Sequence, residues 1–186
     1  IPIYASMCDN AGILTLNTAT PIGGTYLVNG NISTTFTPSV LNVGSNIIDY
    51  TYTDGNGCSA TASQNLIVDP SPFATATTTN ASCNGFTDGT AILNITTGQT
   101  PFIEDWGIAN PTALSAGSYT YTVTDANNCT TVATVMTTQP TQLVVGISGV
   151  QHVSCFGLSD GQALVTATGG TTGYIYTWDN NEASAA

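Results

Sequence analysis

The chain has no lysine and no arginine. Among its 186 residues are 11 acidic side chains and one histidine, so the formal net charge is -11. Proteins bind nucleic acids and anionic membrane surfaces through cationic side chains. The composition therefore argues against both classes of partner. It also leaves His152 and the amino terminus as the cations that could form a salt bridge with a carboxylate.

Long apolar runs are missing as well. A membrane-spanning helix needs about 20 consecutive apolar residues. The chain contains no such run, so we expect no membrane insertion. No signal peptide is present at Ile1, and we expect the chain to be a mature or internal segment of a larger protein. Charged residues make up only 6%, but 41% are hydrophobic, and this balance predicts a folded chain instead of a disordered one.

A convincing helical period is also missing, whereas alternation of apolar and hydroxyl side chains is common. Tyr119, Tyr121 and Val123 alternate with threonines, and 48–52 shows the same pattern. Such alternation is typical of half-buried strands. We therefore predict an all-β chain of antiparallel sandwich modules of about 70 residues with immunoglobulin-like (Ig-like) topology. Tyr119 is expected to form a tyrosine corner, with its hydroxyl bonded back to the preceding turn.

One cysteine motif occurs twice. The segment 82–91 returns as 154–163, at a spacing of 72 residues. A fixed period of this kind indicates an array of modules. We predict an Ig-like module at 1–69, a repeat module at 70–140 and an incomplete copy of that repeat at 141–186.

The five cysteines then fall into these modules. The simplest arithmetic is one disulfide per module, Cys8 with Cys58 and Cys83 with Cys129, with Cys155 unpaired. Closing a loop of about 47 residues would stabilise a module by about 4 kcal/mol. Disulfides indicate an oxidising, extracellular setting. The alternative interpretation is buried free thiols.

Aspartates recur in Gly- and Asn-rich segments. Each of these segments reads as a turn, in which Asn and Gly accept positive φ angles. The alternative is a calcium site, because hard cations prefer carboxylate and carbonyl oxygens. No other cofactor is expected. The four candidate residues are Asp54, Asp88, Asp125 and Asp160.

Aromatic side chains offer one further candidate site. Trp106, Tyr26 and Tyr174 are candidates for a platform that binds surface glycans. Trp106 and Trp178 occupy equivalent positions of the repeat, which favours a role in the core over a ligand platform. No nucleophile, acid pair or metal cluster recurs at a sensible spacing, so we expect no enzyme activity.

The second module carries a characteristic set of residues: Cys83-x-Gly85-x-x-Asp88-Gly89, Trp106, Leu114-x-Ala116-Gly117-x-Tyr119, Val123-Thr124-Asp125-x-Asn127-x-Cys129 and Gln139-Pro140. This set resembles the SprB-type repeat of very large surface adhesins of gliding Bacteroidetes. The first module, with Gly23-Gly24-Thr25-Tyr26, resembles the Ig-like modules that accompany such repeats. The resemblance implies an exported, surface-anchored protein, secreted by the type IX route, and supplies no catalytic residue.

These observations together predict a non-catalytic structural and adhesive segment of a cell-surface protein: a stalk, a filament or an adhesin array. The alternative is a carbohydrate-binding module of a secreted enzyme. The expected partners are neighbouring modules, like subunits and surface glycans. The incomplete module at 141–186 is expected to be completed either by its own continuing chain or by a strand from another subunit.

Overall fold

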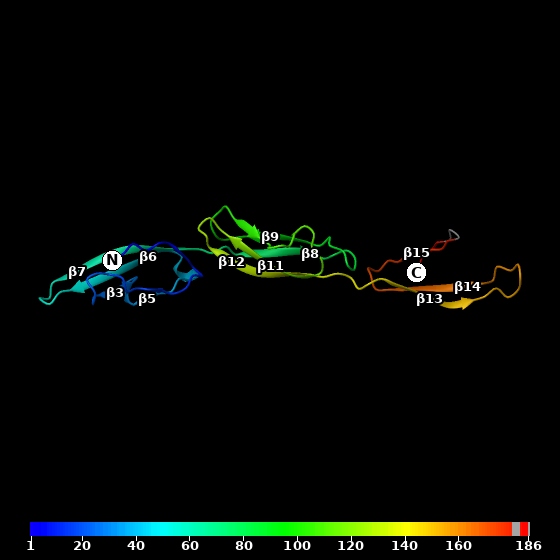
Figure 1. Cartoon of the computed structure of the whole chain (residues 1–186), viewed down its shortest axis with the longest axis horizontal. Helices are drawn as coiled ribbons and strands as arrows, with labels where there is room; N and C mark the ends of the chain where they lie inside the picture. The colour runs from blue at the N-terminus through cyan, green and yellow to red at the C-terminus, as the bar shows by residue number, and fades with distance from the viewer. Residues whose placement is uncertain (180–182, 186) are drawn as a thin grey trace. The chain divides into compact units, whose positions relative to one another are not determined.

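The structure is a computed structural model that describes residues 1–179 and 183–185 (Figure 1). Within these residues the secondary structure is all β except for one 3-10 helix, η1 (Val40–Asn42), which confirms the predicted fold class. No helix in this described part is long and apolar enough to cross a membrane. The strands are β1 (Met7–Cys8), β2 (Leu14–Thr15), β3 (Thr25–Val28), β4 (Asn31–Ile32), β5 (Thr35–Phe36), β6 (Gly44–Thr53), β7 (Ser59–Asp69), β8 (Ala74–Thr79), β9 (Thr90–Ile95), β10 (Ile103–Asp105), β11 (Gly117–Thr124), β12 (Thr130–Thr137), β13 (Val144–Gln151), β14 (Gln162–Thr168), β15 (Ile175–Thr177) and β16 (Ala183–Ala185).

The chain forms two compact units. One unit contains Ile1–Thr75, Leu93–Asp105 and Tyr121–Ala133. The other contains Ala76–Ile92, Trp106–Thr120 and Thr134–Ala186. The module boundaries at 69/70 and 140/141 describe the repeat in the sequence, and they stay a prediction.

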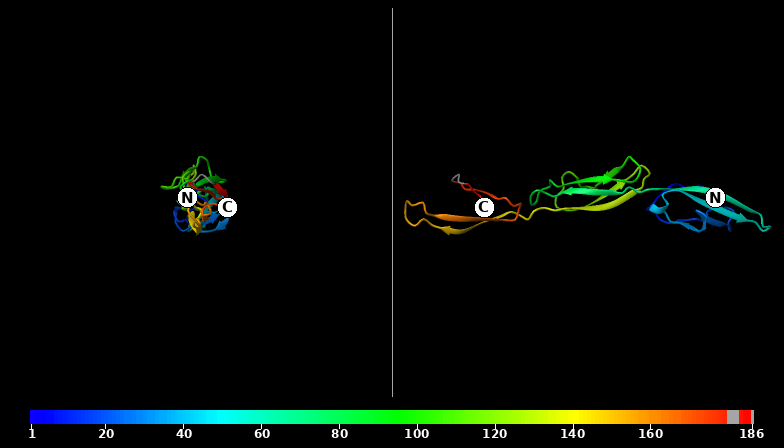
Figure 2. Two further views of the ribbon diagram at one scale, coloured as in Figure 1. Left: turned by 90° about the vertical axis from the view of Figure 1, so that its right-hand side faces the viewer. Right: turned by 180° about the vertical axis from the view of Figure 1, so that it is seen from behind.

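In the first unit, strands β1 to β7 form a five-stranded sheet, with the order β1-β7-β6-β3-β4, and a two-stranded sheet of β2 and β5. Strands β6 and β7 make the long hairpin that is visible in Figures 1 and 2, with Thr53 opposite Ser59 at its tip. All the pairs in these sheets are antiparallel except β1 with β7, in which Cys8 lies opposite Asp69. This parallel pair places the start of the chain at the carboxyl end of β7.

Side chains from the two sheets form the hydrophobic core of this unit. The alternation predicted for 48–52 is present at its centre, since Ile48 and Tyr50 are buried whereas Ile47 is 52% exposed. Full burial of such a side chain contributes about 1.5–3 kcal/mol. The buried cluster consists of Leu16, Ala19, Tyr26, Phe36, Ile48, Tyr50, Leu66 and Val68.

Two tyrosines of this core also join the loop between β2 and β3 to the sheet. The ring of Tyr26 lies 4.6 Å from that of Tyr50, and its hydroxyl accepts a hydrogen bond from the backbone N–H of Ala19 at 2.7 Å. The Tyr50 hydroxyl accepts from the N–H of Gly24 at 2.7 Å and donates to the carbonyl of Pro21 at 2.5 Å. Both phenol groups are therefore satisfied inside the protein, as buried polar atoms require.

The next segment of the chain pairs β8 with β9 and orders three strands as β10-β11-β12. The predicted tyrosine corner is confirmed: the Tyr119 hydroxyl donates to the carbonyl of Ser115 at 3.0 Å and lies 2.9 Å from the Ser115 Oγ. Tyr121 and Val123 are buried on β11, as their alternation with threonine predicts. The period-2 pattern thus identifies the inward face of this strand.

The C-terminal part of the second unit has strand pairing without a core. Strands β13 and β14 pair antiparallel, with a register shift between Ser148 and Gln151, and β15 pairs with β16. No residue of 141–179 is buried, and β13 is exposed along its whole length. Val145 is 60% exposed and Ile147 is 67% exposed. This segment therefore forms hairpins that leave apolar side chains in contact with solvent.

The predicted disulfide pairing is wrong. Cys8 is bonded to Cys129, and Cys58, Cys83 and Cys155 are free and exposed. Strand length explains why Cys8 does not reach Cys58. Cys8 pairs with the last residue of β7, whereas Cys58 precedes the first residue of this 11-residue strand. At about 3.3 Å per residue the two are separated by roughly 36 Å, far beyond the roughly 7 Å that a disulfide can span.

The same reason applies to Cys83 and Cys129. Cys129 immediately precedes β12, a strand of eight residues. The turn that contains Cys83 lies at the other end of this strand, because the N–H of Gly85 donates to the side-chain carbonyl of Gln139 at 2.7 Å. Cys129 thus precedes the first residue of β12, whereas the turn of Cys83 is bonded to Gln139, beyond its last residue. The number of residues between two cysteines does not give their distance in space when an extended strand lies between them.

The interpretation of the aromatic residues as a glycan platform is also wrong for two of its three members. Tyr26 is 7% exposed in the core, and Trp106 is 8% exposed. A sugar ring stacks on an exposed aromatic face, which neither residue presents. Tyr174 is half-buried and donates its hydroxyl hydrogen to the carbonyl of Gly169 at 2.5 Å. The core position that the repeat favours for Trp106 is confirmed.

Candidate functional site

Two hairpins of the chain have the same local structure, and we call 54–58 and 125–129 the closing hairpins. In each, the first residue is an aspartate whose N–H donates to the carbonyl of the cysteine four residues later, at 2.9 Å in 54–58 and 3.0 Å in 125–129. The aspartate Oδ1 accepts from the N–H groups two and four residues later, at 2.9 Å for both in 54–58, and at 2.9 and 2.8 Å in 125–129. A single carboxylate thus holds each hairpin together.

The residue before the cysteine completes this geometry. Gly57 has φ 86° and Asn128 has φ 63°. Glycine adopts this left-handed region readily, and asparagine tolerates it better than most residues. The sequence pattern Asp-x-x-Gly/Asn-Cys therefore specifies the closing hairpin, and the interpretation of Asp54 and Asp125 as turn residues agrees with their contacts.

The two closing hairpins differ in burial. Asp125 is 4% exposed, and its second oxygen accepts from the N–H of Gln99 at 3.0 Å. Cys129, beside it, is 1% exposed. Asp54 and Cys58 are exposed. The same local hydrogen bonds therefore involve an exposed aspartate and cysteine in one copy and a buried aspartate and cysteine in the other.

Three turns each begin at a cysteine, and we call 8–11, 83–86 and 155–158 the opening turns. In each, the cysteine carbonyl accepts a hydrogen bond from the N–H three residues later, at 3.0, 3.1 and 3.2 Å in chain order. Gly85 and Gly157 supply positive φ angles of 81° and 88°. The turn at Cys8 has Asn10 in the corresponding place, so it shares the hydrogen bond but not the glycine.

A serine and an aspartate fasten the second and third opening turns. The Asp88 carboxylate accepts from the N–H of Ser82 at 2.9 Å and from its hydroxyl at 2.5 Å. Asp160 makes the same pair of bonds with Ser154, at 3.0 and 2.5 Å. Hydrogen bonds from the serine hydroxyl, and then from its N–H, lower the pKa of Asp88 and the pKa of Asp160 below 3.8, because they favour the charged carboxylate.

Replacing the serine should therefore change the titration of the aspartate. We expect Ser82→Ala to raise the pKa of Asp88 toward 3.8, with the Asp160 carboxylate as an internal control. Because the pKa in the folded turn is the lower one, the bonds stabilise this turn above the unfolded pKa, and the effect is lost as pH falls through the folded pKa. Carboxyl chemical shifts followed by NMR between pH 6 and pH 2 measure it. Equal titration of Asp88 in both proteins would rule out the hydroxyl as the cause.

Around the Cys8–Cys129 disulfide, an opening turn contacts a closing hairpin. The two Cα atoms are 5.5 Å apart. Beside them the Asn10 side-chain amide donates to the carbonyl of Thr130 at 2.8 Å. Asp9 is 9% exposed and accepts from the N–H of Ser71 at 3.0 Å. Covalent and hydrogen-bonded contacts thus join the first predicted module to the second within one compact unit.

The four aspartates that could hold calcium are not brought together. Each lies in its own turn and accepts hydrogen bonds from N–H or hydroxyl groups of that turn, and Asp125 accepts one more from the N–H of Gln99. Among residues 1–179 and 183–185, no group of three or more His, Cys, Asp or Glu side chains is placed to hold a metal ion. Calcium binding stays a prediction without a built site.

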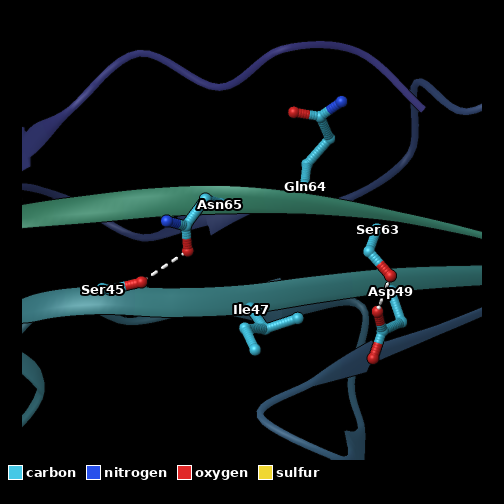
Figure 3. A pocket seen from close by; sticks show the side chains of 6 residues that line it. All are labelled: Ser45, Ile47, Asp49, Ser63, Gln64 and Asn65. Carbon is cyan, nitrogen blue, oxygen red and sulfur yellow. Dashed lines mark hydrogen bonds between the residues drawn. The ribbon is translucent and has the colours of Figure 1, made fainter.

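The outer face of the β6–β7 hairpin carries polar side chains that pair across the two strands. Figure 3 shows a shallow hollow on this face, where Ser45 donates to Asn65 at 2.5 Å and Ser63 donates to Asp49. Nearer the tip, hydroxyls of Thr51 and Thr61 are 2.7 Å apart. Cross-strand pairs of this kind stabilise a sheet by about 0.2–1 kcal/mol each. They do so here in a chain that has no lysine or arginine for ion pairs.

Sequence reasoning missed the residues around the disulfide. Asp9 and Asn10 adjoin a cysteine, and their polar side chains were a local signal that this turn contacts another segment. Gln99, which donates its N–H to Asp125, uses only its backbone, so its side chain carries no signal. Contacts made by backbone groups are invisible to a motif.

Comparison with known proteins identifies one part of the chain. A model of the SprB repeat family matches residues 148–183. No curated protein and no solved structure matches the chain. The segment 148–183 is therefore similar to the SprB repeat. It contains the third opening turn with its Ser154–Asp160 pair.

Proposed function

We propose that the chain is a non-catalytic structural and adhesive segment of a large exported cell-surface protein. The observation that carries this proposal is the match of 148–183 to the SprB repeat. The opening turn at 83–86 repeats the structure of the matched turn at 155–158, down to the serine–aspartate pair, which supports a second repeat of the same kind at 70–140. The chain is then a series of modules.

Further features support an extracellular location and an Ig-like first module. The chain contains the Cys8–Cys129 disulfide, and disulfides form and persist in oxidising compartments such as the extracellular space. The first 69 residues hold seven strands in two sheets around one core, the strand number of a constant-type Ig sandwich. Many weakly binding modules on one chain produce adhesion by multivalency, without a deep pocket in any of them.

Antibodies raised against the 186-residue chain test the proposal on cells that make the parent protein. We expect them to label intact cells and to reduce cell attachment to a surface, with antibodies to a cytosolic protein as the control. Labelling only after permeabilisation would contradict the surface location. Labelling of intact cells with unchanged attachment would contradict the adhesive role.

A further inference from the structure

The disulfide joins two different kinds of structure. Cys8 belongs to an opening turn of the first predicted module, and Cys129 belongs to a closing hairpin of the second. The closing hairpin of the first module, 54–58, has the same set of hydrogen bonds as the bonded hairpin 125–129. The bond therefore links the opening turn of one module to the closing hairpin of the module that follows it.

The free cysteines belong to the same two classes. Cys58 lies in a closing hairpin, and Cys83 and Cys155 lie in opening turns. All three thiols are exposed. Cys83 precedes just one closing hairpin, 125–129, and the cysteine of that hairpin is already bonded to Cys8. No segment with the Asp-x-x-x-Cys pattern of a closing hairpin follows Cys155 in this sequence.

Apolar side chains beside the two free opening turns are left in solvent. Phe86, three residues after Cys83, is 54% exposed. Beside Cys155, Phe156 is 108% exposed and Leu158 is 52% exposed. In the bonded opening turn, by contrast, Asp9 is 9% exposed and the Asn10 side chain donates to the carbonyl of Thr130, directly after the closing hairpin. The apolar side chains of the free turns thus remain in solvent, whereas the bonded turn contacts the start of β12.

We propose that Cys83 and Cys155 are sites of disulfide formation with closing-hairpin cysteines of other modules of this kind, and that Cys58 is a site for an opening-turn cysteine. The partner is recognised by its geometry, which is the Asp-fastened hairpin on one side and the cysteine turn on the other. Repetition of the Cys8–Cys129 rule would place one covalent bond at every junction between modules. The inference does not depend on the adhesive role, because modules can be linked whether or not they adhere.

The chemistry is thiol–disulfide exchange. Two thiols become one disulfide and release two protons and two electrons, and a low-molecular-weight disulfide such as oxidised glutathione takes up the electrons and becomes two thiols. The reaction passes through a mixed disulfide, which the second thiol attacks. Exposure of Cys58, Cys83 and Cys155 gives the reagent access to each of them.

The purified chain itself supplies both classes, since Cys58 of one copy can meet Cys83 or Cys155 of another. An equal mixture of unlabelled and ¹⁵N-labelled chain, incubated in a glutathione redox buffer, is alkylated and digested with pepsin, because trypsin has no site in a chain without lysine and arginine. Mass spectrometry then identifies the linked peptides. Mixed isotopes in a linked pair mark a bond between two copies, and unmixed isotopes alone mark a bond within one chain.

We expect Cys58–Cys83 and Cys58–Cys155 links between copies to exceed all other new links by about tenfold. Each chain has one free thiol in a closing hairpin and two in opening turns. If these thiols met at random, fewer than half of all links between copies would join a closing hairpin to an opening turn. Links in random proportion, links confined to one chain, or no links between thiols that react readily with an alkylating reagent would overturn the proposal.

Two variants separate geometry from thiol chemistry. Cys58→Ser should abolish the mixed links and leave Cys83 and Cys155 alkylated. Asp54→Ala keeps the Cys58 thiol but removes the carboxylate that holds its hairpin, and we expect the preference for opening turns to fall at least threefold. Asp54 is exposed, so this variant should fold, which the dispersion of its NMR spectrum checks. An unchanged preference in Asp54→Ala would overturn the role of the hairpin geometry.

Discussion

Cys8→Ser should lower the free energy of unfolding by about 4 kcal/mol. The disulfide that this change removes joins residues 121 positions apart. In the chain-entropy model, a loop of this length restricts the unfolded chain enough to contribute about 4–5 kcal/mol, which is the upper end of what disulfides contribute. Serine at this half-buried position keeps the size of the side chain, and Cys129 remains as a buried thiol without leaving a cavity.

Cys83→Ser is the matched control, because it also changes a cysteine in an opening turn, but a free and exposed one. A surface change of this kind should alter the free energy of unfolding by less than about 0.5 kcal/mol. Urea unfolding followed by circular dichroism measures both variants, and hydrogen exchange at the Val123 amide reports on the buried strand β11. A loss below about 1 kcal/mol for Cys8→Ser would contradict the stabilising role of the bond.

Asp125→Ala should cost about 3 kcal/mol, whereas the same change at Asp54 should cost about 1 kcal/mol or less. The Asp125 carboxylate accepts from the N–H groups of Asn127, Cys129 and Gln99. Its removal leaves the buried N–H of Cys129 without an acceptor, and a buried donor without a partner costs about 1–3 kcal/mol. The part-buried donors of Asn127 and Gln99 lose their acceptor as well and add to this cost. Around exposed Asp54, water replaces the lost acceptor.

The pair Asp125→Ala and Asp54→Ala forms its own control, since the two hairpins share their hydrogen bonds and differ in burial. Asp125→Asn adds a finer test, because an amide oxygen can still accept from Asn127 and Cys129, while its NH₂ group cannot accept from Gln99. For this variant we expect an intermediate loss, with faster hydrogen exchange concentrated at Gln99. Equal losses for Asp54→Ala and Asp125→Ala would show that burial does not set the energy of this turn.

Local features of this fold could be predicted from the sequence, because they depend on residues close together in the chain. Alternation with threonine identified the buried face around Tyr50 and Tyr121, and the segment 114–119 predicted a tyrosine corner at Tyr119. Those patterns follow from the period-2 geometry of a strand and from turn chemistry. They hold whichever strands become neighbours.

The disulfide could not be predicted in the same way. Which cysteines meet depends on β1 running parallel to the end of β7 and on the contact of Asn10 with Thr130, and neither is encoded in a spacing. The prediction of one disulfide within each module required that the two cysteines of a module lie close together. The hairpin β6–β7, with 10 and 11 residues in its strands, instead sets the two cysteines of the first module at opposite ends.

The bond between Cys8 and Cys129 also changes how the chain would transmit a pull. Tension applied along the backbone passes through the disulfide, so the residues between the two cysteines, which span 121 positions, are bypassed. At about 3.5 Å per extended residue, roughly 400 Å of contour length would stay stored until the bond is reduced. Strand pairing within this loop is therefore shielded from the load, and the extensibility of a tether built from such modules would be governed by the redox state of its surroundings.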